Sequence, residues 1–177
     1  MGEKLALKTK ISIYRFKDPS GEIYRKLKGG TPAEEMAKER KEEFVGYSET
    51  TGNKLLNCGA ARVIDLMIGQ VDVGGAWSHE NAEIGVGDGT TPEDPSQTGL
   101  TGTNQAYAGM DSEYPKRQGD VQVVFQATFG LNEAAFTWNE FVVRHKTDMV
   151  CLNRKVSAQG TKPADEIWTV VVTITLQ

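Results

Sequence analysis

The sequence predicts one domain that is mainly β with minor α, built as an antiparallel β-sandwich or barrel with an N-terminal hairpin and two helices. The chain has 177 residues, of which 38% are hydrophobic, and this is enough for a single core. From residue 120 to the C-terminus, apolar and polar residues alternate in short segments separated by turn-forming residues. Such alternation is typical of antiparallel strands. No apolar run approaches the roughly 20 residues of a membrane-spanning helix.

The first predicted element is a hairpin within residues 6–28. Residues 10–15 alternate as a strand does, and residues 22–27 contain enough β-forming side chains to pair with them. Asp18, Pro19 and Gly21 lie between the two segments and suit a turn, because Pro presets φ and Gly accepts a positive φ.

A first helix is predicted over residues 32–45. Thr31 can cap its start, Pro32 suits the first helical position, and Gly46 can end it in the left-handed conformation. Charged residues dominate this segment and its apolar stripe is thin. We therefore expect the helix on the surface, or held there by a partner.

A second helix is predicted within residues 53–69. Ala60, Val63, Ile64 and Met67 follow the i, i+3, i+4, i+7 spacing that places side chains on one helix face. Asn57 can cap this helix and Gly69 can end it. The apolar face predicts that the helix packs on the core.

The remaining strands are predicted at residues 83–87, 120–129, 136–143, 149–155 and 168–176. Residues 88–105 are rich in Gly, Thr, Pro and Asp and predict a long exposed loop that adds nothing to the core. We divide the chain into residues 1–52, the hairpin and charged helix expected to act as an attachment arm, and residues 53–177, the β-rich core domain.

The charge distribution is uneven although the net charge is only −4. Residues 1–30 are basic, and the segment between Arg62 and Lys116 contains no Lys or Arg but many carboxylates. A nucleic-acid site needs basic and aromatic side chains gathered on one face, which this pattern does not predict. The asymmetry favours contacts between protein subunits.

No arrangement of residues predicts catalysis. The sequence shows no nucleophile with a base and no clustered metal ligands, so we expect neither an enzyme nor a bound cofactor or metal. Residues 85–89 contain three glycines, but they lack the Gly-Lys-Ser/Thr ending of a phosphate-binding loop, so we interpret them as a strand end entering a turn. Cys58 and Cys151 are expected to be free buried thiols.

The sequence leaves two alternative binding sites to consider. Asp88, Glu93 and Asp94 lie on the predicted loop and carry oxygen ligands suited to Ca²⁺. Trp77 lies in a Gly-rich segment and is a candidate for carbohydrate binding, whereas Trp138 and Trp168 lie in alternating strands and are expected in the core.

Several segments resemble a widespread group of bacteriophage virion proteins. Residues 55–61 read Leu-Leu-Asn-Cys-Gly-Ala-Ala, residues 84–92 read Ile-Gly-Val-Gly-Asp-Gly-Thr-Thr-Pro, residues 96–100 read Ser-Gln-Thr-Gly-Leu, and residues 152–154 read Leu-Asn-Arg before an alternating C-terminal strand. The similarity spans about residues 55–177. The charged helix at 32–45 and Gly99 depart from the pattern of this group, which includes capsid decoration proteins and tail or fibre subunits.

The resemblance implies a non-enzymatic structural protein of a phage particle, located in the virion after synthesis in the host cytoplasm. We expect a capsid decoration (cement) protein that stabilises the shell, because the chain is small and lacks collagen-like or coiled-coil repeats. A tail, neck or fibre-base subunit is the alternative, and a Ca-dependent carbohydrate-binding module is a third reading. The expected partners are the major capsid protein and copies of the chain in a homotrimer, with no nucleic acid, membrane or small-molecule substrate. The expected contact residues are Lys8, Lys10, Arg15, Arg25, Lys26, Lys28, Met36, Phe44, Asp88, Thr90, Thr91 and Pro92.

Overall fold

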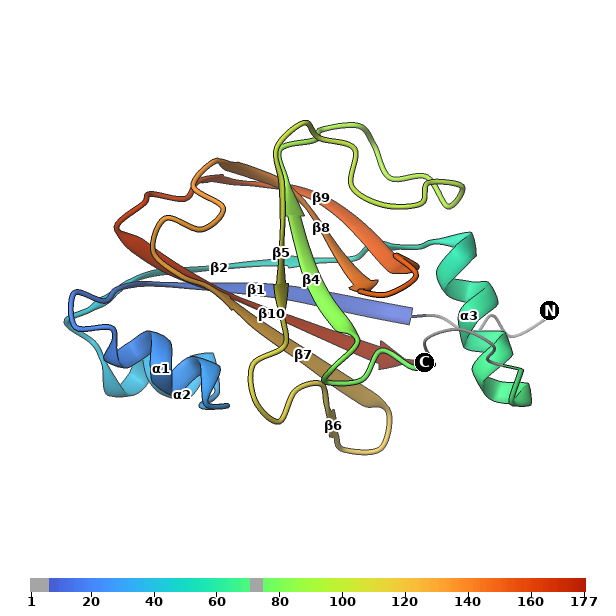
Figure 1. Ribbon diagram of the computed structural model, residues 1–177, viewed down its shortest axis with the longest axis horizontal. Helices are drawn as coiled ribbons and strands as arrows, with labels where there is room; N and C mark the ends of the chain where they lie inside the picture. Colours follow the sequence, from blue (N-terminus) through green and yellow to red (C-terminus); the bar gives the residue numbers. More distant parts are fainter. Residues whose placement is uncertain (1–6, 71–74) are drawn as a thin grey trace.

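The computed structural model describes residues 7–70 and 75–177 and shows two five-stranded antiparallel sheets packed as a β-sandwich (Figure 1). Sheet A has the order β2-β1-β10-β7-β6, and sheet B has the order β3-β9-β8-β4-β5. The predicted sandwich is confirmed, and the described strands do not close into a barrel. The strands are β1 (Leu7–Lys17), β2 (Phe44–Thr51), β3 (Lys54–Leu55), β4 (Ala82–Gly87), β5 (Gln105–Gly109), β6 (Lys116–Gln118), β7 (Gln122–Phe129), β8 (Thr137–His145), β9 (Cys151–Thr161) and β10 (Glu166–Leu176).

The core lies between the two sheets and is centred on aromatic side chains. Trp138 makes edge contacts with Phe129, Phe141 and Trp168, at ring-centroid distances of 5.0, 6.2 and 4.8 Å. Trp138 and Trp168 are buried, as their place in alternating strands predicts. The five strands predicted from residue 83 onward are all present, because each buries apolar side chains against the facing sheet.

The predicted N-terminal hairpin is wrong, because residues 22–28 form helix α1 (Glu22–Lys28) instead of a strand. The buried Asp18 carboxylate accepts hydrogen bonds from the backbone N–H groups of Ile23 and Tyr24, at 3.3 and 2.8 Å, and so satisfies the helix start. Ile23 and Leu27, four residues apart, are both buried. β1 pairs with β10 and β2, so the sandwich includes strands from both sides of the division predicted at residue 52.

The predicted helix over residues 32–45 is much shorter. Helix α2 (Ala33–Glu39) ends before Arg40, and residues from Phe44 onward belong to β2. Pro32, not Thr31, is the N-cap and makes no side-chain capping hydrogen bond, and the first helical amide, the Ala33 N–H, donates to the Gln126 side-chain oxygen at 3.0 Å. Phe44 packs on Phe16 in a second apolar cluster beneath α1 and α2, so pairing with β1 overrides the local helical pattern.

Helix α3 (Asn57–Ile68) lies at the opposite end of the sandwich from α1 and α2 (Figure 1). Gly69 ends it in the left-handed conformation at φ 72°, as predicted. The predicted Asn57 cap is wrong, because Leu56 is the N-cap and no side chain caps the helix. Within residues 7–70 and 75–177, no helix is both long and apolar enough to cross a membrane.

Candidate functional site

The loop over residues 88–104, here called the Gly-Thr-Pro loop, is held by a single buried carboxylate beneath it. Glu140 on β8 is fully buried and accepts hydrogen bonds from the backbone N–H groups of Gly89 (3.2 Å), Thr101 (3.0 Å) and Gly102 (2.7 Å). These three donors come from the two ends of the loop. Glu140 therefore fixes where the chain leaves β4 and where it returns to β5.

Arg154 on β9 also holds this loop. Its fully buried guanidinium pairs with the Glu140 carboxylate at 2.6 Å. It also donates to the Thr91 carbonyl at 2.9 Å, to the Gln97 side-chain oxygen at 2.8 Å and to the Thr101 hydroxyl at 3.0 Å. Its remaining donors thus find acceptors along the loop, as a buried charge requires.

The glycines of this region allow the loop to approach Glu140 closely. A Cβ on Gly87 or Gly89 would collide with the Glu140 carboxylate, and a Cβ on Gly102 would collide with the Asp88 side chain. The glycine run at residues 85–89 is thus a strand end entering a turn, as interpreted from the sequence, and its glycines make room for a side chain of the protein itself.

The three loop carboxylates considered for Ca²⁺ are each engaged in local contacts. Asp88 accepts from the Asn104 backbone N–H at 3.0 Å and from its side-chain amide at 2.6 Å. Glu93 accepts from the Val156 backbone N–H at 2.7 Å, and Asp94 accepts from the Ser96 backbone N–H at 2.8 Å. Across the part of the chain that the structure describes, no three His, Cys, Asp or Glu side chains gather as metal ligands.

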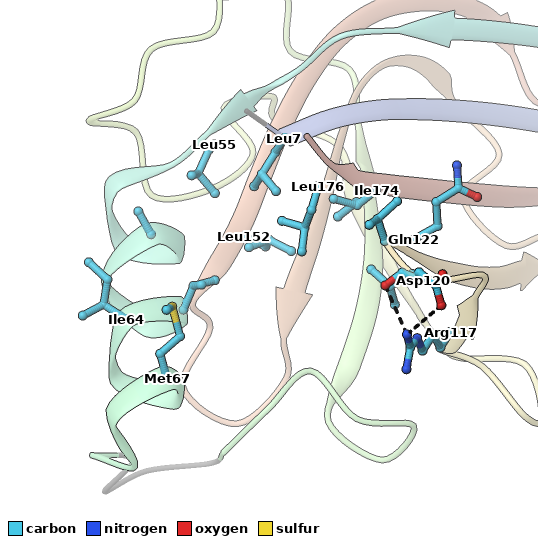
Figure 2. Close-up of a pocket in the computed structure, with 14 residues that line it drawn as sticks. Leu7, Leu55, Ile64, Met67, Arg117, Asp120, Gln122, Leu152, Ile174 and Leu176 are labelled. Carbon is cyan, nitrogen blue, oxygen red and sulfur yellow. Dashed lines mark hydrogen bonds and ion pairs between the residues drawn. The ribbon is translucent and has the colours of Figure 1, made fainter. Parts of the chain in front are cut away.

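A second surface feature is an apolar groove of about 540 Å³ between α3 and the strand ends of sheet A, here called the α3 groove. Figure 2 shows Leu7, Leu152, Ile174 and Leu176 on the strand side of this groove and Met67 on its helix side, on α3. On the far side, the Arg117 guanidinium pairs with the Asp120 carboxylate at 3.3 Å (Figure 2).

The prediction that α3 packs its apolar face on the core is therefore wrong in part. Val63 and Leu66 touch the core, but Ile64 is 57% exposed, Met67 78% and Ile68 62%. The reason is the close approach of the helix start to β9, where a Cβ on Gly59 would collide with the Leu152 and Cys151 carbonyl oxygens. The start of α3 lies against the strand, while its apolar side chains line an open groove.

The basic residues predicted as contacts are spread over β1 and α1 and mostly engage neighbours. Lys10 pairs with Glu49 at 3.5 Å, Lys26 with Glu39 at 2.7 Å, and Lys28 with the fully buried Asp111 at 3.0 Å. The half-buried Arg15 donates to the Ser48 hydroxyl at 2.8 Å and lies over the Trp168 ring. Lys8 and Arg25 are exposed.

The apolar and loop residues predicted as contacts divide into two groups. Met36 is fully buried and Phe44 is half-buried under the helices, so Met36 is core and offers no contact surface. Thr90, Thr91 and Pro92 are exposed at the start of the Gly-Thr-Pro loop, and Asp88 is half-buried at its base. Thr90, Thr91 and Pro92 lie together on one exposed segment, and Lys8 and Lys10 are both exposed on β1.

Trp77 is not an exposed binding side chain. It is 8% exposed within the core cluster, and its indole N–H donates to the Val150 carbonyl at 3.3 Å. The two cysteines are free thiols, with Cys151 buried and Cys58 partly buried. Burial raises the pKa of the Cys151 thiol to about 12.

Sequence reasoning missed Glu140 and the role of Arg154. Glu140 lies two residues from the buried Val142, so it shares a face of β8 with an apolar side chain. A carboxylate at such a position requires a buried partner, and this signal was available in the sequence. The partner itself was not, because Arg154 faces Glu140 only through the pairing of β8 with β9.

Comparison of the chain with known proteins finds no matching family model, no similar curated protein and no similar solved structure.

Proposed function

We propose that this chain is a structural protein of a bacteriophage particle, most specifically a capsid decoration subunit that binds and stabilises the shell. The observation that supports the proposal is the convergence of the resembling segments on one structural unit. The Leu-Asn-Arg segment is distant in sequence from the Ile-Gly-Val-Gly-Asp-Gly-Thr-Thr-Pro run and from the Thr-Gly-Leu segment that follows this run. Arg154, from the last of these, donates to the Thr91 carbonyl within the first.

Such a unit is suited to presenting a rigid surface to a partner. A loop of this length normally pays a large entropic cost when it binds, and buried hydrogen bonds that order it in advance reduce that cost. Here Glu140 and Arg154 order the loop from below, while Thr90, Thr91 and Pro92 stay exposed at its start. The proposal assigns this segment to contact with the capsid shell.

The α3 groove supplies an apolar surface of the kind that interaction sites expose. In this proposal it takes an apolar segment of the major capsid protein, because its walls are aliphatic and its two charged rim residues, Arg117 and Asp120, already neutralise each other. The partner segment therefore needs no matching charge at the centre of the contact.

The test uses particles made without this protein, to which the purified full chain is added back. We expect particles without the chain to release DNA at a lower temperature and the added chain to restore the stability. Cryo-EM of the restored particles should then show it on the shell. Density at the tail, neck or fibre base, or particle stability that does not depend on the chain, would contradict the decoration role.

A matched pair of variants tests the groove. Met67→Lys places a charge at a side chain that is 78% exposed, so it should leave folding intact but weaken particle binding at least about ten-fold, which corresponds to about 1.4 kcal/mol. Leu131→Lys makes the same kind of change at a side chain that is 43% exposed, in the turn between β7 and β8, and should bind normally. Equal binding by both variants would remove the groove from the contact.

A further inference from the structure

The outer edge of β2 is the longest open strand edge among the residues that the structure describes. Sheet A ends at β2 and β6, and sheet B ends at β3 and β5. β2 has 8 residues, against 3 in β6, 2 in β3 and 5 in β5. β2 contains neither Pro nor Lys, the residues with which proteins commonly block an edge.

The backbone groups that face outward from β2 follow from its register with β1. The Gly52 N–H donates to the Thr9 carbonyl at 2.8 Å, and the next residues pair as Thr51 with Lys10. Successive residues of an antiparallel strand point their N–H and C=O groups alternately toward one neighbour and the other. Ser48 and Thr50 therefore face β1, as Gly52 does, and Tyr47, Glu49 and Thr51 face outward.

The outward-facing residues also expose their side chains. Tyr47, Glu49 and Thr51 are exposed, whereas Ser48 and Thr50 between them are only half-exposed. Tyr47 stacks on Tyr14 of β1 with ring centroids 4.9 Å apart, and its hydroxyl donates to the Glu49 carboxylate. The edge thus presents ordered side chains together with backbone groups that only another extended strand can pair.

We propose that a second copy of this chain pairs with this edge, β2 against β2, antiparallel about a two-fold axis at Ser48. In this alignment Tyr47 of each copy lies opposite Glu49 of the other, so the Glu49 carboxylates do not face each other. A two-fold interface must be self-complementary, and Tyr47 and Glu49, placed one residue to either side of Ser48, meet this requirement.

This association differs from the homotrimer expected from the sequence. A ring of three through β2 would need a second, complementary edge on each copy, whereas two-fold pairing uses β2 alone. Two-fold pairing joins the two copies of sheet A into one continuous sheet. The inference does not rest on the proposed function, because it concerns the chain in isolation and its test needs no particle.

The first experiment measures the mass of the full chain in solution by sedimentation velocity over a range of concentrations. We expect a reversible dimer. Tyr47→Pro removes an outward N–H without removing a bond to β1, and Tyr47→Lys adds a charge to the edge, so both should weaken dimerisation at least ten-fold. Leu131→Lys, at an exposed apolar site away from the edge, should dimerise as the unaltered chain does. A monomer at all concentrations, a trimer, or a dimer indifferent to both Tyr47 variants would overturn the proposal.

The second experiment looks for a cross-link between two copies. A positive result is the formation of a new bond, so it cannot be mistaken for the loss of stability in a variant. In the proposed alignment the two Ser48 residues oppose each other as a non-hydrogen-bonded pair, with Cα atoms about 4.5 Å apart, a separation that a disulfide accepts. Ser48→Cys should therefore form a disulfide between copies on mild oxidation. Thr50→Cys should not, because Thr50 would lie opposite Gly46. No cross-link from Ser48→Cys, or an equal yield from Thr50→Cys, would overturn the alignment.

Discussion

The carboxylate of Glu140 and the guanidinium of Arg154 form a fully buried ion pair at 2.6 Å, and together they hold the Gly-Thr-Pro loop. The two residues are 14 positions apart and are brought together by the pairing of β8 with β9. Within the part of the chain that the structure describes, all other hydrogen bonds of the two side chains are with the loop, from the Gly89 N–H at its start to the Gly102 N–H near its end. Hydrogen bonds to sheet B thereby hold both ends of a long segment without helix or strand.

Glu140→Gln should destabilise the protein severely. The substitution leaves the Arg154 guanidinium buried without its counter-charge, and breaking a buried pair in this way costs about 3–5 kcal/mol. Chemical denaturation followed by tryptophan fluorescence measures this loss, and amide hydrogen exchange at Gly89 and Gly102 should rise in the same variant.

The double variant Glu140→Gln with Arg154→Met supplies the control for this prediction. It removes both charges, so it should be less destabilised than Glu140→Gln alone. Glu42→Gln, at an exposed position, should leave stability unchanged. A single Glu140→Gln variant as stable as Glu42→Gln would mean that the pair does not hold the loop.

Gly59→Ala should destabilise the protein by about 1–3 kcal/mol, because the added methyl group has no space between α3 and β9. Its Cβ would lie 2.8 Å from the Cys151 carbonyl oxygen, a backbone atom that cannot move without shifting the strand. Gly109→Ala is the matched control, since nothing lies within 4 Å of a Cβ there. Thermal melts of both variants check the prediction, and equal melting temperatures would contradict it.

The Asp88 carboxyl should titrate below the usual range for aspartate. The hydrogen bond from the Asn104 side-chain amide, with further backbone hydrogen bonds, lowers the pKa of Asp88. A group whose pKa is lowered by folding stabilises the folded state above its unfolded pKa of about 3.9 and loses this effect as the pH falls through the folded value. The contacts at the base of the loop should therefore persist at neutral pH and weaken below about pH 4. Carbon NMR of the Asp88 carboxyl reports its pKa, which should rise in Asn104→Ala; the same pKa in both proteins would contradict this account.

Cys151 should not react with thiol reagents in the folded protein. Burial raises the pKa of its thiol to about 12, so almost no thiolate forms at pH 8, and only 1% of the side chain is exposed. Mass spectrometry after treatment with iodoacetamide should find Cys151 unmodified in the native protein and modified after denaturation. Rapid native labelling at this position would show that the strand pairs around it open readily.

The strands β7, β8 and β10 could be predicted because each carries an alternation that is visible along the chain, whereas β5 and β6 were not predicted. Phe125, Ala127 and Phe129 repeat every second residue, and so do Trp168, Val170 and Val172, and all six are buried. The end of α3 at Gly69 could also be predicted from the local sequence, because a glycine there accepts the positive φ that ends a helix. Features of this kind depend on neighbours within a few residues.

Other features depended on contacts between distant segments. Residues 22–27 contain β-forming side chains, yet the Asp18 carboxylate and the apolar cluster around Phe16 favour a helix there. Residues 44 and 45 continue a helical pattern, but β1 offers them a strand partner. In both places the energy of tertiary packing exceeds the small differences in local propensity.

Some features of the candidate sites could likewise be predicted from local sequence, and others depended on distant contacts. The Gly, Pro and Asp residues of the Gly-Thr-Pro loop mark it in the sequence as an exposed segment, since such residues are uncommon in strands and favour turns. That Glu140 and Arg154 meet beneath it, that α3 leaves Met67 over an open groove, and that β2 ends a sheet were decided by the packing of the two sheets. The composition of a segment indicates whether it can be buried. The partner of a buried charge and the neighbour of an edge strand depend on folding, because folding brings distant parts of the chain side by side.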